Sequence, residues 1–348
     1  MAMDSVARRD VLKMGAAACV AASVAPVLAA CGGSSAAASK TGLTPVKFAL
    51  SWIPGIEWGG TYIAQERGYY RDEGVELTVV PGGPNVAVEP LIATNKVDIG
   101  MTYGLGTATT DINGGSIKIF GTQYQRSPDI ILSLASKPIR SLTELRGKTI
   151  GIPSDTILVW HQFLLRNHIP AAAVHVAPVQ SSLDPLVNGQ VDGIVTYSTE
   201  IAQLPQNTTP VFLYMADYNY NDISNGYGAS TATLATGRDK LIKFMRAEIR
   251  GWQDFTADPE YAAMLTVTKY ARGAGLTLKE TITEAEQTAA LVTYGPVVKA
   301  KGLMWLSAQL EQTVLSVVNA SLKTPVTTAQ IFDDTLLADV YQGHNRIV

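Results

Sequence analysis

Residues 46–102 read VKFALSWIPGIEWGGTYIAQERGYYRDEGVELTVVPGGPNVAVEPLIATNKVDIGMT, and short apolar runs in this stretch alternate with helical patterns. The periodicity predicts strands over 46–51, 76–81 and 97–102, and helices over 60–71 and 87–94. Strands that alternate with helices in this way indicate βαβ units and a parallel sheet. The first part of the folded chain therefore predicts an α/β fold.

The same order of elements recurs after residue 141. Helices are predicted over 142–146, 156–167 and 182–188, and strands over 148–152, 175–178 and 193–197. Two such units predict two lobes. Apolar extended runs at 129–135 and 227–236 fit the two strands of a hinge between them. We therefore expect lobe 1 to comprise residues 44–135 and 229–348, and an inserted lobe 2 to comprise residues 136–228.

The pattern becomes helical after Arg238. Phe244, Trp252 and Phe255 recur with other apolar residues at spacings of three and four, and residues 303–322 behave similarly. We expect these aromatic side chains to face the core rather than a ligand.

The first 30 residues have the pattern of an export signal. Arg8 and Arg9 precede Val11-Leu12-Lys13 and an Ala-rich apolar stretch, which resembles the twin-arginine type. The stretch ends in LAACG at 28–32, which resembles a bacterial lipobox, so Cys31 is expected to carry a lipid and residues 31–43 to form a flexible tether. A transmembrane anchor is the alternative, but a spanning helix needs ~20 apolar residues. We expect an exported protein, lipid-anchored to the membrane in the cell envelope and facing the periplasm or the cell exterior.

Composition excludes several kinds of chemistry. Both cysteines, Cys19 and Cys31, lie in or at the edge of this segment, so no disulfide, cysteine nucleophile or thiolate metal site is expected in the body. The net charge is -3 and no basic stripe occurs, which argues against nucleic acid as a partner. His161 and His168 could share a helix face, and an ordinary solvated face is favoured over a pair of metal ligands there. We expect no metal and no cofactor.

Several motifs resemble one family of ABC importer proteins. Trp52-Ile53-Pro54, followed by YIAQERGYYRDEGVEL at 62–77, is similar to the opening of solute-binding proteins for thiamine-pyrimidine precursors, alkanesulfonates, taurine and nitrate. The resemblance continues in order through 81–84, 95–100, 124–128, 141–152, 189–193 and 250–252. It implies the periplasmic-binding-protein fold of the second type, in which two α/β lobes joined by a two-strand hinge close on a ligand. It also implies an ABC permease and ATPase as partners of a monomeric, non-catalytic protein.

Ligands of open α/β sheets bind beyond the carboxyl ends of strands, so the loops there supply candidate binding residues. The first loop carries the acid Glu57 with Trp52 and Trp58, whose indoles could stack on a heteroaromatic ring, although Trp52 could instead pack as core. The second loop carries Tyr103 and Thr107, and Thr107 could simply begin the next helix.

Two further loops belong to the predicted lobe 2. Ser154, Asp155 and Thr156 open a helix, and Asp155 would repel an anion. Tyr197 and Glu200 follow the last parallel strand, and the resemblance implies that Glu200 hydrogen-bonds an aminopyrimidine edge; an exposed Glu200 without a role is the alternative. Tyr124, beside Arg126, completes the candidate ligand-binding residues, and no catalytic residue is expected.

The aromatic and acidic candidates favour a cationic or neutral N-heterocycle, such as a thiamine pyrimidine precursor. An alkanesulfonate, taurine or nitrate ligand is the alternative, which would gain support if Arg126 pointed into the cleft. The related pyrimidine synthase enzymes consume a histidine and carry a cysteine-rich motif, whereas this chain has Trp58 at the corresponding place and no cysteine in its body. A receptor subunit that passes its ligand to a signalling partner is the remaining alternative.

Overall fold

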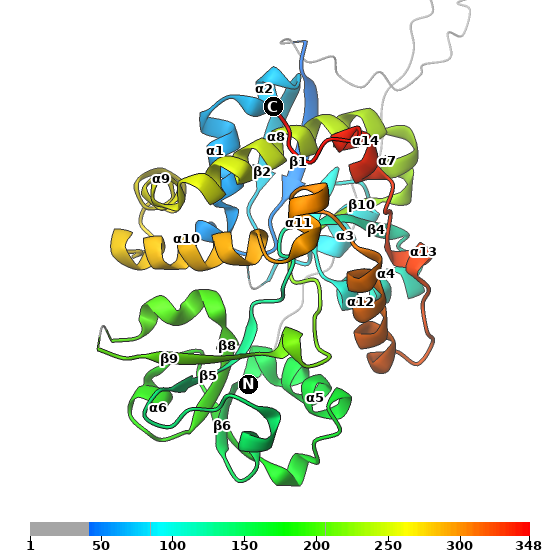
Figure 1. Ribbon diagram of the computed structural model, residues 1–348. Coiled ribbons are helices and arrows are strands. Elements are labelled where there is room, and N and C mark those ends of the chain that lie inside the picture. The colour runs from blue at the N-terminus through cyan, green and yellow to red at the C-terminus, as the bar shows by residue number, and fades with distance from the viewer. Residues whose placement is uncertain (1–41, 84, 206) are drawn as a thin grey trace, which may run out of the picture. The chain divides into compact units, whose positions relative to one another are not determined.

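The computed structural model describes residues 42–83, 85–205 and 207–348. The predicted export signal, Cys31 and most of the predicted tether lie outside the described residues. The described strands form two five-stranded sheets (Figure 1), and we call the part built on the first sheet lobe 1 and the part built on the second lobe 2. Both belong to one compact unit.

The sheet of lobe 1 has the strand order β2-β1-β3-β10-β4. Its strands are β1 (Thr44–Ala49), β2 (Val75–Val80), β3 (Ile99–Thr102), β4 (Ile117–Thr122) and β10 (Gly226–Ser230). β1 pairs in parallel with β2 and β3, through the predicted βαβ connections, and β10 runs antiparallel between β3 and β4. The helix predicted over 60–71 is divided into α1 (Gly59–Glu66) and α2 (Tyr69–Asp72), because Gly68 takes a left-handed conformation with φ 75°.

The sheet of lobe 2 has the strand order β7-β6-β8-β5-β9. Its strands are β5 (Asp129–Leu134), β6 (Thr149–Pro153), β7 (His175–Val179), β8 (Gly193–Tyr197) and β9 (Pro210–Tyr214). β6 pairs in parallel with β7 and β8, whereas β5 is antiparallel to both β8 and β9. The helices between the parallel strands are α5 (Ile157–Arg166) and α6 (Asp184–Val187), close to their predicted positions.

The predicted hinge strands need correction, because neither run forms a connection between the lobes. β5 is a strand of lobe 2, and the run at 227–236 is divided between β10 of lobe 1 and helix α7 (Thr231–Thr236). The chain crosses between the lobes at 123–128 and 215–225. There the backbone N–H of Gln123 donates to the backbone carbonyl oxygen of Asn225 over 2.9 Å. A short apolar run suits a buried strand as well as a hinge, so periodicity alone could not separate the two.

Helix α8 (Arg238–Ala257) buries the predicted face in the core of lobe 1, where Phe244, Trp252 and Phe255 are fully buried. It lies very close to α1. A Cβ at Gly251 would come within 2.1 Å of the Gly60 carbonyl oxygen, so the crossing of the two helices requires glycine there. The core-facing role predicted for these aromatic residues is confirmed.

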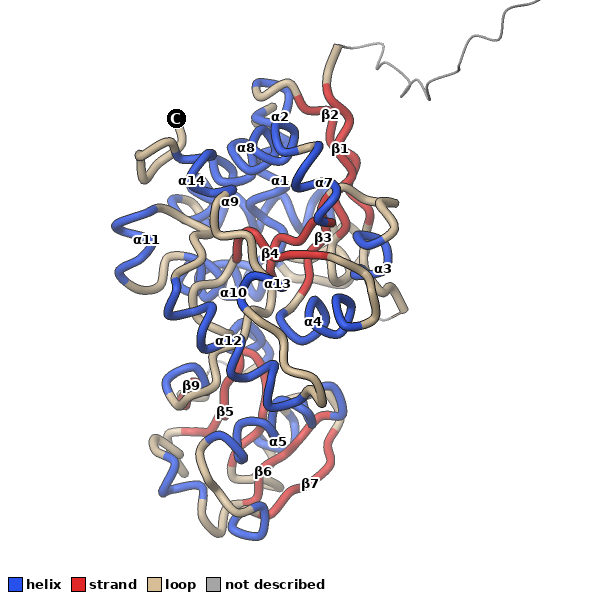
Figure 2. The backbone as a smooth tube through the Cα atoms, turned by 90° about the vertical axis from the view of Figure 1, so that its right-hand side faces the viewer, coloured by secondary structure: helices blue, strands red, loops and turns tan. Residues whose placement is uncertain are grey.

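The remaining helices complete the two lobes. They are η1 (Ile56–Trp58), α3 (Val88–Ala93), α4 (Gly104–Ile112), η2 (Leu142–Leu145), η3 (Ser154–Thr156), η4 (Ala171–Ala173), η5 (Ser198–Gln203), η6 (Met215–Asp217), α9 (Pro259–Leu265), η7 (Thr266–Tyr270), α10 (Leu278–Val292), α11 (Pro296–Lys301), α12 (Ala308–Ser321), α13 (Thr328–Ile331) and α14 (Leu336–Tyr341). Helices α12 and α13 pack against α4 at one side of lobe 1 (Figure 2). Within the described ranges, no helix has both the length and the apolarity needed to cross a membrane.

Candidate ligand-binding site

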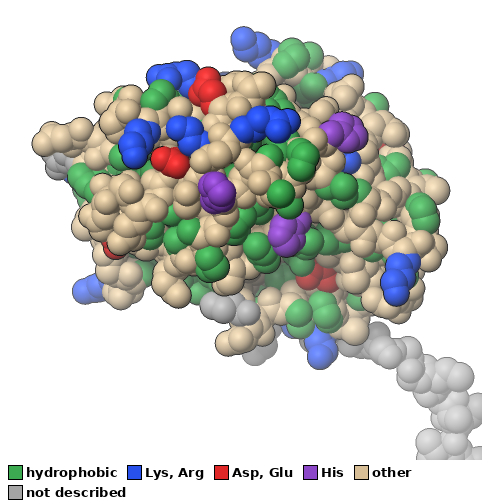
Figure 3. Space-filling view, turned by 90° about the horizontal axis from the view of Figure 1, so that it is seen from below, with side chains coloured by type: hydrophobic (Ala, Val, Ile, Leu, Met, Phe, Trp, Pro, Cys, Tyr) green, Lys and Arg blue, Asp and Glu red, His purple; other side chains and the backbone are tan. Residues whose placement is uncertain are grey.

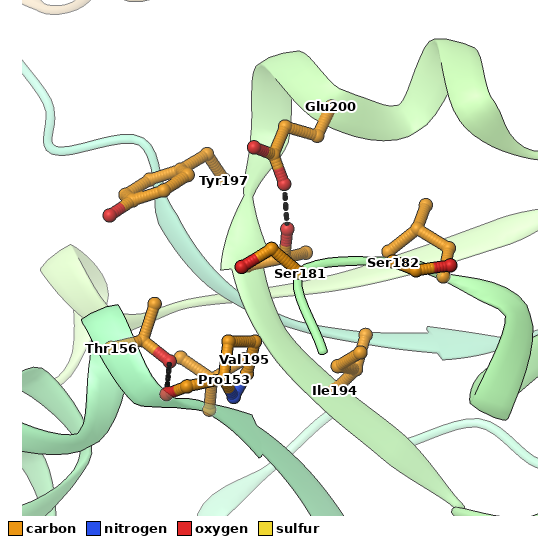
Figure 4. A pocket seen from close by; sticks show the side chains of 10 residues that line it. Pro153, Thr156, Ser181, Ser182, Ile194, Val195, Tyr197 and Glu200 are labelled. Atoms are coloured by element: carbon orange, nitrogen blue, oxygen red, sulfur yellow. Dashed lines mark hydrogen bonds between the residues drawn. The ribbon is translucent and has the colours of Figure 1, made fainter. Parts of the chain in front are cut away.

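A small pocket of about 10 Å³ lies at the carboxyl ends of β6 and β8 in lobe 2. Its lining residues are Pro153, Thr156, Ser181, Ser182, Leu183, Ile194, Val195, Thr196, Tyr197 and Glu200. Figure 4 shows the Tyr197 ring and the Glu200 carboxylate on one side, and Thr156 and Pro153 on the other. The Thr196 hydroxyl donates a hydrogen bond to the Glu200 carboxylate, which fixes this acid at the pocket.

The pocket brings together three residues that the sequence predicted, Thr156, Tyr197 and Glu200. Thr156 is buried, and its hydroxyl donates to the Pro153 carbonyl oxygen over 3.1 Å. Ser154 is exposed at the start of η3, and the side chain of Asp155 lies outside the described part of the structure. Ser181 and Ser182 were not among the residues that the sequence predicted. They lie just after β7, whose carboxyl end lies at the same edge of the sheet as those of β6 and β8, so their position in the sequence could have identified them.

Lobe 1 brings two carboxyl groups towards Glu200. Glu57 lies on η1 and Glu284 lies on α10, which packs against η5 and therefore against the segment that carries Glu200. Burial raises the pKa of Glu57 to about 8, and the charge of Glu284 adds to the shift. Burial likewise raises the pKa of Glu284 to about 7, with a contribution from Glu200. We call Glu57, Glu284 and Glu200 the carboxyl row.

Buried polar groups surround the row. The Gln123 side-chain amide donates to the Glu57 carbonyl oxygen over 2.9 Å, and its Oε1 has no hydrogen-bond partner among the described residues. The candidate Tyr124 is only 7% exposed. Burial, followed by the charges of Glu57 and Glu284, raises the pKa of Tyr124. Tyr124 therefore belongs to the surroundings of the row rather than to the lobe 2 pocket.

Two further acids lie in or next to the crossing segments, Asp222 in the second and Asp129 directly after the first. The Ser127 hydroxyl donates to the Asp129 carboxylate, and burial raises the pKa of Asp129 to about 6. Burial raises the pKa of Asp222 to about 7, although the hydrogen bond that the Ile223 amide donates to it acts in the opposite direction.

The candidate Tyr103 is 48% exposed, and its pKa is raised by burial and then by the charges of Glu89 and Asp222.

The two candidate tryptophans have different environments. Trp52 is 47% exposed after β1, so its ring is available to a ligand. Trp58 is 1% exposed and packs in the core of lobe 1, and its indole N–H donates to the Ile53 carbonyl oxygen over 3.1 Å. This position argues against the predicted stacking role of Trp58. Thr107 is also fully buried, with its hydroxyl 3.1 Å from that of Thr102, and it lies inside α4, which begins at Gly104.

Arg126 is held between the lobes. Its guanidinium carbon lies 3.4 Å from the ring centroid of Tyr214 in lobe 2 and 4.7 Å from that of Tyr294 in lobe 1. The same guanidinium forms an ion pair with Asp217. Because a carboxylate already balances this charge, the main sequence-based argument for an anionic ligand is weakened.

The histidine pair does not share a helix face. Helix α5 ends at Arg166, and His168 follows it in a left-handed conformation with φ 54°. In the part of the chain that the structure describes, no group of three His, Cys, Asp or Glu side chains is placed to hold a metal ion. Figure 3 shows one face of the molecule, on which the visible histidine side chains are separated by hydrophobic and polar side chains.

Comparison of the sequence with known families gives a match over residues 56–262 to the family described as NMT1/THI5 like. The chain is 28% identical over 232 residues to the riboflavin-binding protein RibY of Chloroflexus aurantiacus, covering 65% of this chain and 66% of RibY. It is 24% identical over 241 residues to a formylaminopyrimidine-binding protein of Halalkalibacterium halodurans, covering 65% of this chain and 71% of that protein. The match to RibY thus spans just under two thirds of that relative.

This chain is also similar to an enzyme in sequence and to a solved binding protein in structure. The chain is 31% identical over 135 residues to the 4-amino-5-hydroxymethyl-2-methylpyrimidine phosphate synthase of Schizosaccharomyces pombe, covering 38% of this chain and 39% of the enzyme. The structure of the periplasmic aliphatic sulphonate binding protein SsuA from Escherichia coli matches with a TM-score of 0.62 at 13% identity, covering 83% of this chain and 92% of SsuA. The predicted periplasmic-binding-protein fold is thereby confirmed.

Proposed function

The chain belongs to the NMT1/THI5-like family, and on that premise we propose that it is the solute-binding protein of an ABC importer for a flat N-heteroaromatic molecule, such as a thiamine pyrimidine precursor. One observation carries the proposal. Carboxyl groups from both lobes meet where the lobes adjoin, with Glu200 in lobe 2 and Glu57 and Glu284 in lobe 1. Tyr197 shares the lobe 2 pocket with Glu200, and Tyr124 of the crossing segment lies near Glu57 and Glu284. The similarity to RibY and to the formylaminopyrimidine-binding protein, both named as binders of N-heteroaromatic molecules, supports it.

The proposed binding mode follows from the chemistry of these groups. Exposed Trp52 and Tyr103 offer ring faces, on which a heteroaromatic ring gains about 0.5 to 1.5 kcal/mol beyond area burial. Carboxylates accept N–H donors, so Glu200 suits the amino edge of such a ring. Closure of the lobes would then bury the ligand and present a single closed form to the permease and its ATPase.

The location in the cell is part of the proposal. The sequence of the first 31 residues supports export and a lipid anchor at Cys31, with a monomeric binding protein held at the membrane surface. No catalytic step is proposed. A heterocycle recovered chemically unchanged from the denatured complex would support binding, whereas a converted product would favour the pyrimidine-synthase alternative.

A sulfonate ligand is the second candidate, because the Arg126 Nε is buried without a hydrogen-bond partner among the described residues. A sulfonate oxygen could accept from this N–H. The ion pair of Arg126 with Asp217 opposes this, since an anion would have to compete with the carboxylate. We therefore place the heterocycle first.

A thermal-shift panel tests the proposal on the chain from Gly32 onward. The panel contains hydroxymethyl- and formylamino-pyrimidines, thiamine, riboflavin, taurine, longer alkanesulfonates and nitrate. A ligand at about 100 times its Kd adds about 2.7 kcal/mol to the free energy of unfolding. We expect a shift with a flat heterocycle that Glu200→Gln reduces and that Glu286→Gln, on the exposed side of α10, leaves intact. A shift with sulfonates or nitrate alone would refute the heterocycle assignment.

A further inference from the structure

Two acids of the carboxyl row, Glu57 and Glu284, each lie near another carboxyl group and have no cation paired with them among the described residues. The charge of Glu284 acts on Glu57, and the charge of Glu200 acts on Glu284. Among the described residues, neither Glu57 nor Glu284 forms an ion pair with a Lys, Arg or His side chain. Arg126 follows Tyr124 in the chain, but it is paired with Asp217. Glu57 and Glu284 are partly buried, and carboxyl groups withdrawn from water without a cation are costly to ionise.

Unused hydrogen-bonding groups lie beside the row, and they are a second indication of a ligand. The Oε1 of Gln123 and the hydroxyl of Ser198 are buried and have no partner within the described structure. Gln123 is bonded through its Nε2 to the Glu57 carbonyl oxygen, and Ser198 begins η5, the helix of Glu200. Buried polar groups are normally paired, so each unpaired group requires an explanation.

The geometry restricts what could fill this place. The described residues contain no group of three acidic or histidine side chains close enough together to coordinate one metal ion. An organic cation can interact with acceptors that lie further apart than the ligands of one metal ion, because its charge is spread over a ring and its N–H groups can bond to separate acceptors. Both Gln123 Oε1 and the carboxylates are acceptors.

We propose, on the basis of the proposed function, that the carboxyl row is the subsite for a positively charged group of the ligand, a protonated or alkylated ring nitrogen or an amidinium-like amino-heterocycle. The protein then selects the cationic form of the heterocycle over the neutral form. The cation supplies the charge that lets the row ionise inside the closed protein, and a neutral ring leaves the row protonated.

The test compares ligands that differ in charge but little in shape. The first pair is 4-amino-5-hydroxymethyl-2-methylpyrimidine, which is neutral at pH 8, and its N-methylated pyrimidinium. The second pair is thiamine and its neutral analogue, in which a thiophene replaces the thiazolium ring. The second pair keeps the test valid if the added methyl group of the first does not fit. Affinities are measured by titration calorimetry at pH 8.

We expect at least one pair to show a preference of about tenfold or more for the cation. Glu57→Gln and Glu284→Gln should each reduce that preference to less than about threefold, and Glu286→Gln should retain it. Two variants are used so that the failure of one to fold does not decide the outcome. Equal affinities within both pairs, or a preference unchanged in both variants, would overturn the inference and leave the heterocycle function standing. Binding of sulfonates with no binding of any heterocycle would overturn both.

Discussion

Replacing Glu57 with glutamine is expected to remove part of the pH dependence of stability of the ligand-free protein. The pKa of this carboxyl rises from 4.5 to about 8 in the folded state. Between these values the unfolded chain has released a proton that the folded protein still holds, so stability falls as pH increases through this range. A glutamine side chain has no proton to lose, and its contribution is constant.

The magnitude follows from the size of the shift. At 1.36 kcal/mol per pKa unit, the Glu57 carboxyl alone should make the free energy of unfolding about 3 kcal/mol smaller at pH 8 than at pH 5. For a chain of this size, this corresponds to a decrease of about 5 °C in Tm. Asp129, Asp222 and Glu284 have raised pKa values too, so the wild-type slope contains their contributions. The difference between wild type and variant isolates Glu57.

The assay is urea unfolding of wild type, Glu57→Gln and Glu286→Gln, without ligand, at pH 5, 6, 7 and 8. The wild type and Glu286→Gln should lose stability together, and Glu57→Gln should lose about 3 kcal/mol less over the same range. Parallel curves for the wild type and Glu57→Gln would refute the reasoning, because they would mean that Glu57 is as well solvated in the folded protein as in the unfolded chain.

Three other variants test the core and the site. Glu248→Leu should lower the free energy of unfolding, measured in urea, by about 4 kcal/mol or more. The buried Glu248 carboxylate accepts four hydrogen bonds, from Thr61, Tyr70, Tyr227 and Trp252, and the substitution would leave these donors unpaired. The control Glu260→Leu, at an exposed position, should change the free energy of unfolding little. Gly251→Ala should lower the free energy of unfolding by about 2 kcal/mol, since its Cβ would lie 2.1 Å from the Gly60 carbonyl oxygen. The control Gly55→Ala, whose Cβ would have its nearest atom at 3.9 Å, should be tolerated. A Gly251→Ala variant as stable as the wild type would contradict the close packing of α1 and α8. Tyr103→Ala should weaken heterocycle binding about tenfold in calorimetry without changing the unfolding curve, and unchanged affinity would remove Tyr103 from the site.

The sequence was sufficient for features that depend on neighbours along the chain. The alternation of β-rich and helical runs predicted the parallel strands β1, β2, β3, β6, β7 and β8, but it did not predict β4 and β9, and it assigned β5 and β10 to a hinge. The spacing of Phe244, Trp252 and Phe255 predicted the buried face of α8. Thr156, Tyr197 and Glu200 could be selected as candidates because they follow strands, and parallel strands end at one edge of a sheet.

Only the tertiary structure decided which of these segments meet. Trp52 and Trp58 occupy one loop, yet Trp52 is exposed and Trp58 is packed in the core. Glu284 lies on an ordinary amphipathic helix, and it reaches Glu57 and Glu200 only because α10 packs against η1 and η5. Periodicity fixes the face that a side chain occupies, but it does not fix the element that covers that face. The carboxyl row is therefore a property of packing between distant segments, whereas the order of strands and helices follows from local sequence.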